Sequence, residues 1–319
     1  MRRLVFVEGV PGAGKSTTAQ FLARQLTRHR RSARWFYEEQ IPNPFVPEID
    51  PADYRDWHHF IDLRVERWRA FTRDASRSTE TLVADSVLLQ TPVFTMLRRD
   101  VAPAMIEDLL IRLVEVVAPL RPKLVYLAHP KPEDAWRAIA ARRGADFVAG
   151  AVRRSEEWAF LHSRGLSGLP GVLAYWQAHG ALCDHIMSSL PMETLVLDAS
   201  EGTWTERRAR MCAFFDVTAD EPPAPDPCAL APLVGRYRKG ERGLTVRLHD
   251  GRLVLQGTLW PSNALLPVSF HLFDVEAWPF QIRFEEDADG RVRALHWQGP
   301  RLWWGGPEGV YHRDPEEAG

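Results

Sequence analysis

Eight residues near the start of the chain have the types and spacing of a phosphate-binding loop. The stretch GVPGAGKS runs from Gly9 to Ser16 and fits G-x-x-x-x-G-K-[ST] at every fixed position. Glycines let successive backbone N–H groups turn inward around phosphate oxygens, and the positive end of the following helix points to the same place. In such a loop the lysine, Lys15, contacts the β and γ phosphates, and the hydroxyl of Ser16 binds Mg²⁺.

The sequence around this loop has the context that such a motif requires. A short apolar run, Leu4 to Val7, precedes the loop and predicts a strand, and a helical pattern follows it. The guanine-specific sequence Asn-Lys-x-Asp is absent from the chain, which disfavours a regulatory GTPase, and we therefore expect ATP with Mg²⁺. The nucleotide-binding residues that the motif predicts are Gly9, Gly12, Ala13, Gly14, Lys15, Ser16 and Thr17.

Carboxylates follow several of the other predicted strands. Glu38 and Glu39 end one strand, and the similar strings ETLVAD and ETLVLD end at Asp85 and Asp198. The carboxyl ends of parallel strands face the ligand crevice in doubly wound sheets. Carboxylates there have two uses, which are to order Mg²⁺ and its waters and to accept the proton of a hydroxyl that attacks a phosphate. Glu38 is the first candidate for the general base, with Glu39 and Asp85 as alternatives, and solvated strand-end carboxylates are the competing interpretation.

Arginine and glutamine side chains later in the chain supply further candidates. Arg142 and Arg143 directly precede Gly144, a candidate hinge, and guanidinium groups that close over a transferring phosphate spread its charge. Gln90 is a candidate polar contact for the phosphate acceptor. Arg164 lies in HSRGLSGLPG, which is either a substrate loop containing this arginine or an ordinary connector.

Short apolar runs alternate with longer helical periods from Met1 to about Asp216. This alternation predicts an α/β fold with a parallel sheet and helices on both faces. The expected strands are Leu4–Val7, Ala33–Tyr37, Thr81–Ala84, Lys123–Leu127 and Thr194–Leu197. The expected helices include an aromatic one around Trp57 to Phe71, together with Ala104 to Val117, Pro132 to Arg142 and Val172 to Ser189.

The composition changes at a proline-rich stretch that we predict to be a linker. TADEPPAPDPCALAP, residues 218–232, carries five prolines, which fix φ and remove backbone donors. It separates a first domain, 1–217, from a second, 233–313. In the second, alternating runs surround Asp250-Gly251 and Asp289-Gly290, which predict β-hairpins, and RLWWGGPEGVYHR suggests a third hairpin around Gly305-Gly306. The second domain resembles the small, barrel-like antiparallel β domains appended to bacterial hydrolases.

The first domain resembles the thymidylate kinase and deoxynucleoside kinase group of P-loop proteins. The resemblance lies in VEGVPGAGKSTTAQFLARQL and extends to KLVYLAHPKPEDAWRAIAARRG, which is similar to the fourth strand, acidic helix start and arginine-bearing lid of those kinases. It implies that the acid after the second strand contacts the acceptor or the metal. The strand order of the group favours Asp85 as the Mg²⁺-ordering acid and places Asp198 near the adenine. Thymidylate kinases follow this aspartate with an arginine that grips the acceptor's phosphate, whereas this chain has Ser86, which favours an acceptor with a bare hydroxyl.

Composition narrows the class of protein. The chain has 319 residues, a formal net charge of -2 and three cysteines without metal-like spacing, so we expect no nucleic-acid partner and a reduced, cytoplasmic setting. No apolar stretch reaches the about 20 residues that cross a bilayer, so we expect no membrane partner. The oligomeric state stays open.

These features favour an ATP-dependent, Mg²⁺-requiring kinase for a small molecule. The acceptor is a nucleoside, a sugar-like metabolite or a natural product such as an antibiotic. Two alternatives remain, a nucleoside monophosphate kinase and an ATP-hydrolysing switch or adaptor with the β domain as its recognition module.

Overall fold

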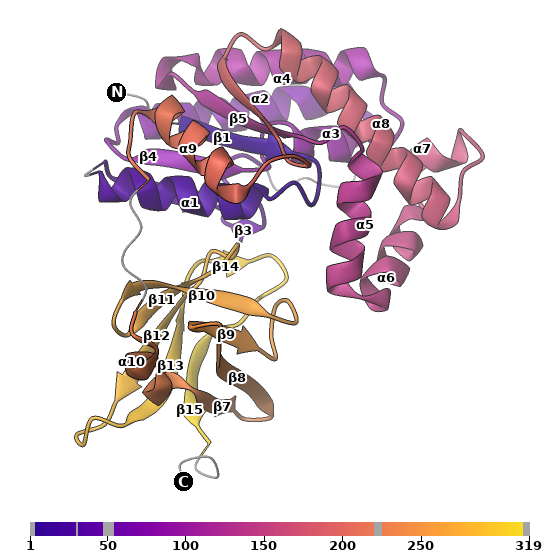
Figure 1. The fold of residues 1–319 in the computed structure, drawn as a ribbon. Helices are drawn as coiled ribbons and strands as arrows, with labels where there is room; N and C mark the ends of the chain where they lie inside the picture. Colours follow the sequence, from indigo (N-terminus) through magenta and orange to yellow (C-terminus); the bar gives the residue numbers. More distant parts are fainter. Residues whose placement is uncertain (1–3, 30, 47–53, 220–224, 315–319) are drawn as a thin grey trace. The chain divides into compact units, whose positions relative to one another are not determined.

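The computed structural model describes residues 4–29, 31–46, 54–219 and 225–314. The chain divides into two compact units. The first comprises residues 1–38 and 42–219, and the second comprises residues 39–41 and 220–319. The division falls inside the proline-rich stretch, and the three residues that follow Glu38 in the sequence also belong to the second unit. Each unit has a different architecture (Figure 1).

A five-stranded parallel sheet forms the centre of the first unit. Its strands are β1 (Leu4–Gly9), β2 (Ala33–Phe36), β4 (Thr81–Asp85), β5 (Lys123–Ala128) and β6 (Glu193–Asp198). They are ordered β2-β4-β1-β5-β6, with β1 in the middle and Val7 paired with Asp85. The five predicted strands are therefore confirmed, and the unit has a P-loop kinase-like fold in which β1 delivers the phosphate loop beside the ends of β4 and β5.

Helices cover both faces of this sheet. They are α1 (Lys15–Arg28), α2 (Trp57–Ser76), α3 (Gln90–Leu97), α4 (Pro103–Val117), α5 (Pro132–Arg143), α6 (Ala145–Ser155), α7 (Ala159–His162), α8 (Gly168–Ser189) and α9 (Trp204–Phe215). Alternation along β1 shows the two layers, because successive side chains of a strand point to opposite faces. Leu4 and Phe6 are buried against α2, α3, α4 and α8, whereas Val5 and Val7 are buried against α1 and α9.

The aromatic helix α2 begins at a side-chain cap. The carboxylate of Asp56 accepts hydrogen bonds from the backbone nitrogens of His58 and His59, which satisfies two donors of the first turn. The buried side of α2 is apolar except at Arg64 and Thr72, and its residues recur at the predicted three- and four-residue spacing. Trp68 stacks on Phe6 of β1, with ring centroids 5.8 Å apart, and thereby fixes α2 on the sheet.

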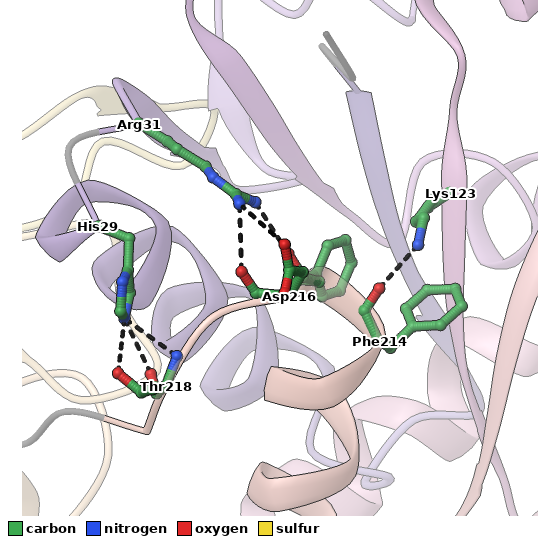
Figure 2. Close-up of polar contacts among 7 residues, drawn as sticks. His29, Arg31, Lys123, Phe214, Asp216 and Thr218 are labelled. Atoms are coloured by element: carbon green, nitrogen blue, oxygen red, sulfur yellow. Dashed lines mark hydrogen bonds and ion pairs between the residues drawn. The ribbon is translucent and has the colours of Figure 1, made fainter.

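At the amino edge of the sheet, basic side chains bind the end of α9 (Figure 2). Lys123 Nζ donates to the carbonyl of Phe214 at 2.7 Å, and Arg31 donates to the carbonyls of Phe215 at 2.8 Å and Asp216 at 3.1 Å. His29 Nε2 lies 3.1 Å from the backbone nitrogen of Thr218. Cations stabilise a helix C-terminus, where carbonyls lack partners. His29 and Arg31, which follow α1, therefore bind backbone groups at and just after the C-terminal end of α9. These bonds hold the chain where it leaves the first unit.

The second unit is a closed antiparallel barrel, which confirms the predicted small, barrel-like β domain. Together with the parallel sheet of the first unit, it confirms the predicted fold class. A short helix, α10 (Pro227–Leu230), and a 3₁₀ turn, η3 (Ala231–Leu233), precede it. Its strands are β7 (Gly235–Lys239), β8 (Arg242–His249), β9 (Arg252–Gln256), β10 (Asn263–Ser269), β11 (Leu272–Val275), β12 (Gln281–Glu286), β13 (Val292–Gln298) and β15 (Gly309–Arg313). The hairpins around Asp250-Gly251 and Asp289-Gly290 are confirmed as β8–β9 and β12–β13.

The third predicted hairpin, around Gly305-Gly306, is wrong. β14 (Arg301–Leu302) does not pair with β15, and instead pairs with β3 (Gln40–Ile41), with Leu302 opposite Gln40. β15 closes the barrel between β13 and β7. The alternating pattern was local, whereas the pairing partner of β14 comes from a segment about 260 residues earlier in the chain, a separation that no hairpin signal can reveal.

Candidate active site

The phosphate loop joins β1 to α1 and has the backbone geometry that its glycines allow. Gly12 and Gly14 both have φ of 91°, in the left-handed region. A Cβ at Gly12 would lie 2.6 Å from the carbonyl oxygen of Ala135, so only glycine fits there without a shift. Helix α1 has no side-chain cap and no acidic residue in its first turn. Its N-terminal N–H groups therefore remain open to an anion.

Lys15, the loop lysine, lies at the buried start of α1. Its ammonium donates to the carbonyl of Val10 at 3.0 Å, within the loop. It also acts electrostatically on Glu8 and Asp85, and lowers the pKa of both carboxyl groups against the opposite effect of burial. The lysine thus lies between the phosphate loop and the two acids that end β1 and β4.

Asp85 and Ser16 form the part of the site that fits Mg²⁺. The Asp85 carboxylate is buried and accepts hydrogen bonds from the hydroxyls of Ser16 and, at 2.7 Å, Ser86. Its other oxygen, Oδ2, is buried without a hydrogen-bond partner among the described residues. Burial raises the pKa of this carboxyl, and Lys15 and the two hydroxyls oppose that effect. Carboxylate and hydroxyl oxygens are Mg²⁺ ligands, and the orphaned Oδ2 beside the loop is where a cation would be accepted.

In the described part of the chain, no group of three or more His, Cys, Asp or Glu side chains is arranged around a metal. Mg²⁺ keeps several waters and uses one or two protein groups together with phosphate oxygens, unlike a structural zinc ion. Asp198, the alternative acid, instead accepts the backbone N–H of Ser200 at 2.7 Å, which closes a turn after β6.

Glu38 and Gln90 meet on the other side of the candidate site. Gln90 Nε2 donates to Glu38 Oε2 at 3.0 Å, and the Thr91 hydroxyl lies 3.4 Å from the same oxygen. Because the amide nitrogen faces Glu38, the amide oxygen Oε1 faces away, and it is buried without a partner among the described residues. The structure therefore brings together two residues that are 52 positions apart in the sequence and that the sequence analysis proposed separately.

Glu8 positions this pair, a role that the sequence analysis did not assign. Its two carboxylate oxygens accept the backbone N–H groups of Leu88, at 2.6 Å, and Gln90, at 3.0 Å. These bonds hold the start of α3 against the end of β1. Burial raises the pKa of Glu8 to about 7, and the backbone donors and Lys15 limit the rise. The Glu-Gly sequence before the loop was the signal that could have identified this residue.

We expect Glu8 to make stability depend on pH. Its folded pKa of about 7 lies above the ordinary 4.5, so its contribution is fully present below pH 4.5 and is lost as the pH rises through 7. A pKa difference of this size corresponds to a change of on the order of 3 kcal/mol in the free energy of unfolding. Denaturant titrations at several pH values should show the free energy of unfolding of the wild type falling relative to that of Glu8→Gln across this range. A difference that stays constant or grows with pH would contradict the assignment.

The predicted lid arginines lie in the α5–α6 region. Arg142 and Arg143 occupy the exposed end of α5, where Gly144 turns the chain into α6 with a φ of 85°, and Arg143 packs over the ring of Phe147. Arg164 donates to Asp100 at 2.6 Å and packs over Phe160, which holds it in the connector before α8. A contact between any of these arginines and phosphate stays a prediction.

Glu39, the second candidate base, has different surroundings from Glu38. It belongs to the second unit, where its carboxylate accepts the indole N–H of Trp304 at 2.7 Å and its carbonyl accepts the N–H of Trp303 at 3.1 Å. Glu38, by contrast, contacts Gln90 in the first unit. Of the two candidate bases, Glu38 is therefore the one that contacts Gln90 of the first unit.

Comparisons with known proteins give a limited result. No protein-family model and no curated protein matches the sequence. Among solved structures, the chain is similar to a deoxyadenosine kinase from M. mycoides with bound dATP, at 16% identity and a TM-score of 0.35. That similarity covers 67% of this chain and 100% of the other. Of the described helices, none has the length and apolar character needed to span a bilayer.

Proposed function

We propose that the protein transfers the γ-phosphate of ATP to a hydroxyl group of a small molecule. The observation that carries this proposal is the convergence of two sets of side chains at the carboxyl ends of β1, β2 and β4. Lys15, Ser16 and Asp85 form a phosphate and Mg²⁺ site, and the paired Glu38 and Gln90 lie on the neighbouring strand end and helix.

The first set binds and orients ATP. The open N–H groups of the loop and of α1 hold the phosphate oxygens. When ATP binds, the ammonium of Lys15 leaves the carbonyl of Val10 and donates to the β and γ phosphates instead. Ser16 and Asp85 would hold Mg²⁺, which supplies neutralisation of charge on the phosphates when bound. These residues place the γ-phosphate at the edge of the sheet where β2 and β4 also end.

The second set serves the acceptor. Glu38 accepts the proton of the attacking hydroxyl, and Gln90 holds the carboxylate in one orientation for that task. Ser86, which replaces the arginine of thymidylate kinases, donates its hydroxyl to Asp85 and so supports the metal site. An acceptor phosphate therefore has no cationic partner at that position, which supports a bare hydroxyl over a nucleoside monophosphate.

A product assay separates this proposal from an ATP-hydrolysing switch. The protein is incubated with Mg-ATP and a pool of nucleosides, sugars and hydroxylated natural products, and the mixture is examined by mass spectrometry. We expect ADP and one phosphorylated compound to form together. ADP and inorganic phosphate without any phosphorylated compound would contradict transfer and favour the switch.

A further inference from the structure

Arg64 is a buried cation whose charge nothing in the described part of the chain balances. The residue lies on α2 and is 0% exposed, and all three of its guanidinium nitrogens lack a hydrogen-bond partner among the described residues. The guanidinium lies over the face of the Phe60 ring, 5.8 Å from its centroid. Burial lowers the pKa of Arg64 to about 10, so the side chain is still charged at neutral pH. A buried, unpaired guanidinium is costly, and proteins keep such a group where a ligand pairs with it.

The position of Arg64 places it at the edge of the sheet where the reaction would occur. α2 runs back towards the start of β4, as the crossover helix between parallel strands does. Arg64 precedes the last residue of α2, Ser76, by 12 positions, or about 18 Å. Trp68, one turn after Arg64, stacks on Phe6, which pairs with Ala84 of β4, so Arg64 lies one turn nearer the carboxyl end of that strand, where Asp85 is.

The surroundings of Arg64 connect it to the helix that carries Gln90. Arg64 and Arg98 both interact electrostatically with Tyr54, and Arg98 follows the last residue of α3, the helix that begins at Gln90. Arg98 packs over the ring of Phe94, 4.8 Å away, and Phe94 in turn stacks on Trp176 of α8. Both arginines thus lie over aromatic rings, Arg64 over Phe60 and Arg98 over Phe94.

We infer that Arg64 binds a carboxylate of the acceptor molecule. A guanidinium presents a planar fork of donors that matches a carboxylate, and one negative charge balances one buried positive charge. The Phe60 ring beside it suits an apolar or aromatic body between this carboxylate and the hydroxyl that Glu38 activates. This inference rests on the proposed function and names its substrate class, a hydroxy acid.

The first test measures the protein without ligand. Arg64→Met keeps the length of the side chain and removes the unpaired charge, so we expect a midpoint of thermal unfolding equal to or above that of the wild type. Arg69→Met, on the exposed side of the same helix, is the matched control and should change little. A large fall for Arg64→Met alone would mean that the protein itself already pairs the guanidinium, and would overturn the inference.

The second test measures ligand class. With a non-hydrolysable ATP analogue and Mg²⁺ present, equilibrium dialysis compares pooled hydroxy acids with matched alcohols that lack the carboxylate. We expect the wild type to retain carboxylate-bearing compounds and Arg64→Met to bind them on the order of 10²-fold more weakly, with Arg64→Lys in between. Equal retention of the hydroxy acids and their matched alcohols by the wild type, or equal retention of the hydroxy acids by wild type and Arg64→Met, would overturn the inference. A retained hydroxy acid that ATP does not phosphorylate would count against the proposed transfer and leave the carboxylate site standing.

Discussion

Replacing Lys15 with alanine is expected to lower ATP turnover by about 10³-fold, because one fixed donor to a developing phosphate charge contributes on that order. The fold should survive the change, since the ammonium donates its hydrogen bond to the carbonyl of Val10 in the loop rather than to the core. The measurement is steady-state release of ADP, with circular dichroism and thermal unfolding to verify the fold.

Arg69→Ala is the control for that experiment, because it also removes one positive charge and lies on an exposed part of α2 that pairs only with Glu66 in the described ion pairs. Its turnover should equal that of the wild type. Turnover that survives in Lys15→Ala would show that the loop from Gly9 to Ser16 is not the site of ATP chemistry.

Glu38→Gln is expected to lower kcat for the phosphorylated product by on the order of 10²- to 10⁴-fold, the usual contribution of a positioned general base. The substitution keeps the size of the side chain, and its amide oxygen can still accept the bond from Gln90 Nε2, so the pair should stay assembled. ATP binding should be unchanged, because Lys15 and Ser16 hold the phosphates. Product formation and nucleotide affinity are therefore measured on the same variant.

Glu39→Gln is the matched control, one residue further along and bonded to Trp304. We expect it to retain kcat near that of the wild type. A large loss in Glu39→Gln with little loss in Glu38→Gln would reverse the assignment of the base.

The parts of the site that are local in sequence were predictable, because their physical signals are local. Gly12 and Lys15 belong to one loop with the spacing typical of phosphate-binding loops, and the strand before it ends at a glycine. The other strands were found because buried parallel strands are continuous apolar runs, and their ends located Glu38 and Asp85. The hairpin turn at Asp250-Gly251 was likewise a signal contained in two residues.

The remaining features depend on contacts between distant segments. Gln90 was a candidate by type alone, and only the fold shows that Glu8 holds its backbone and that Glu38 receives its amide. The sequence showed that Arg64 interrupts the apolar side of α2. It did not show that this side chain is completely buried without a hydrogen-bond partner among the described residues. The separation of Glu38 from Glu39 into different units depends on the pairing of β3 with β14, which the sequence pattern did not reveal.

The most direct test of the central claim is a crystal structure with Mg²⁺ and a non-hydrolysable ATP analogue. We predict that the γ-phosphate lies beside Lys15, that the metal contacts the Ser16 hydroxyl with Asp85 bound to it directly or through water, and that the Glu38 carboxylate faces open space next to the γ-phosphate where an acceptor hydroxyl fits. A γ-phosphate directed away from Glu38 and Gln90, or a metal that leaves Asp85 uncontacted, would contradict the account.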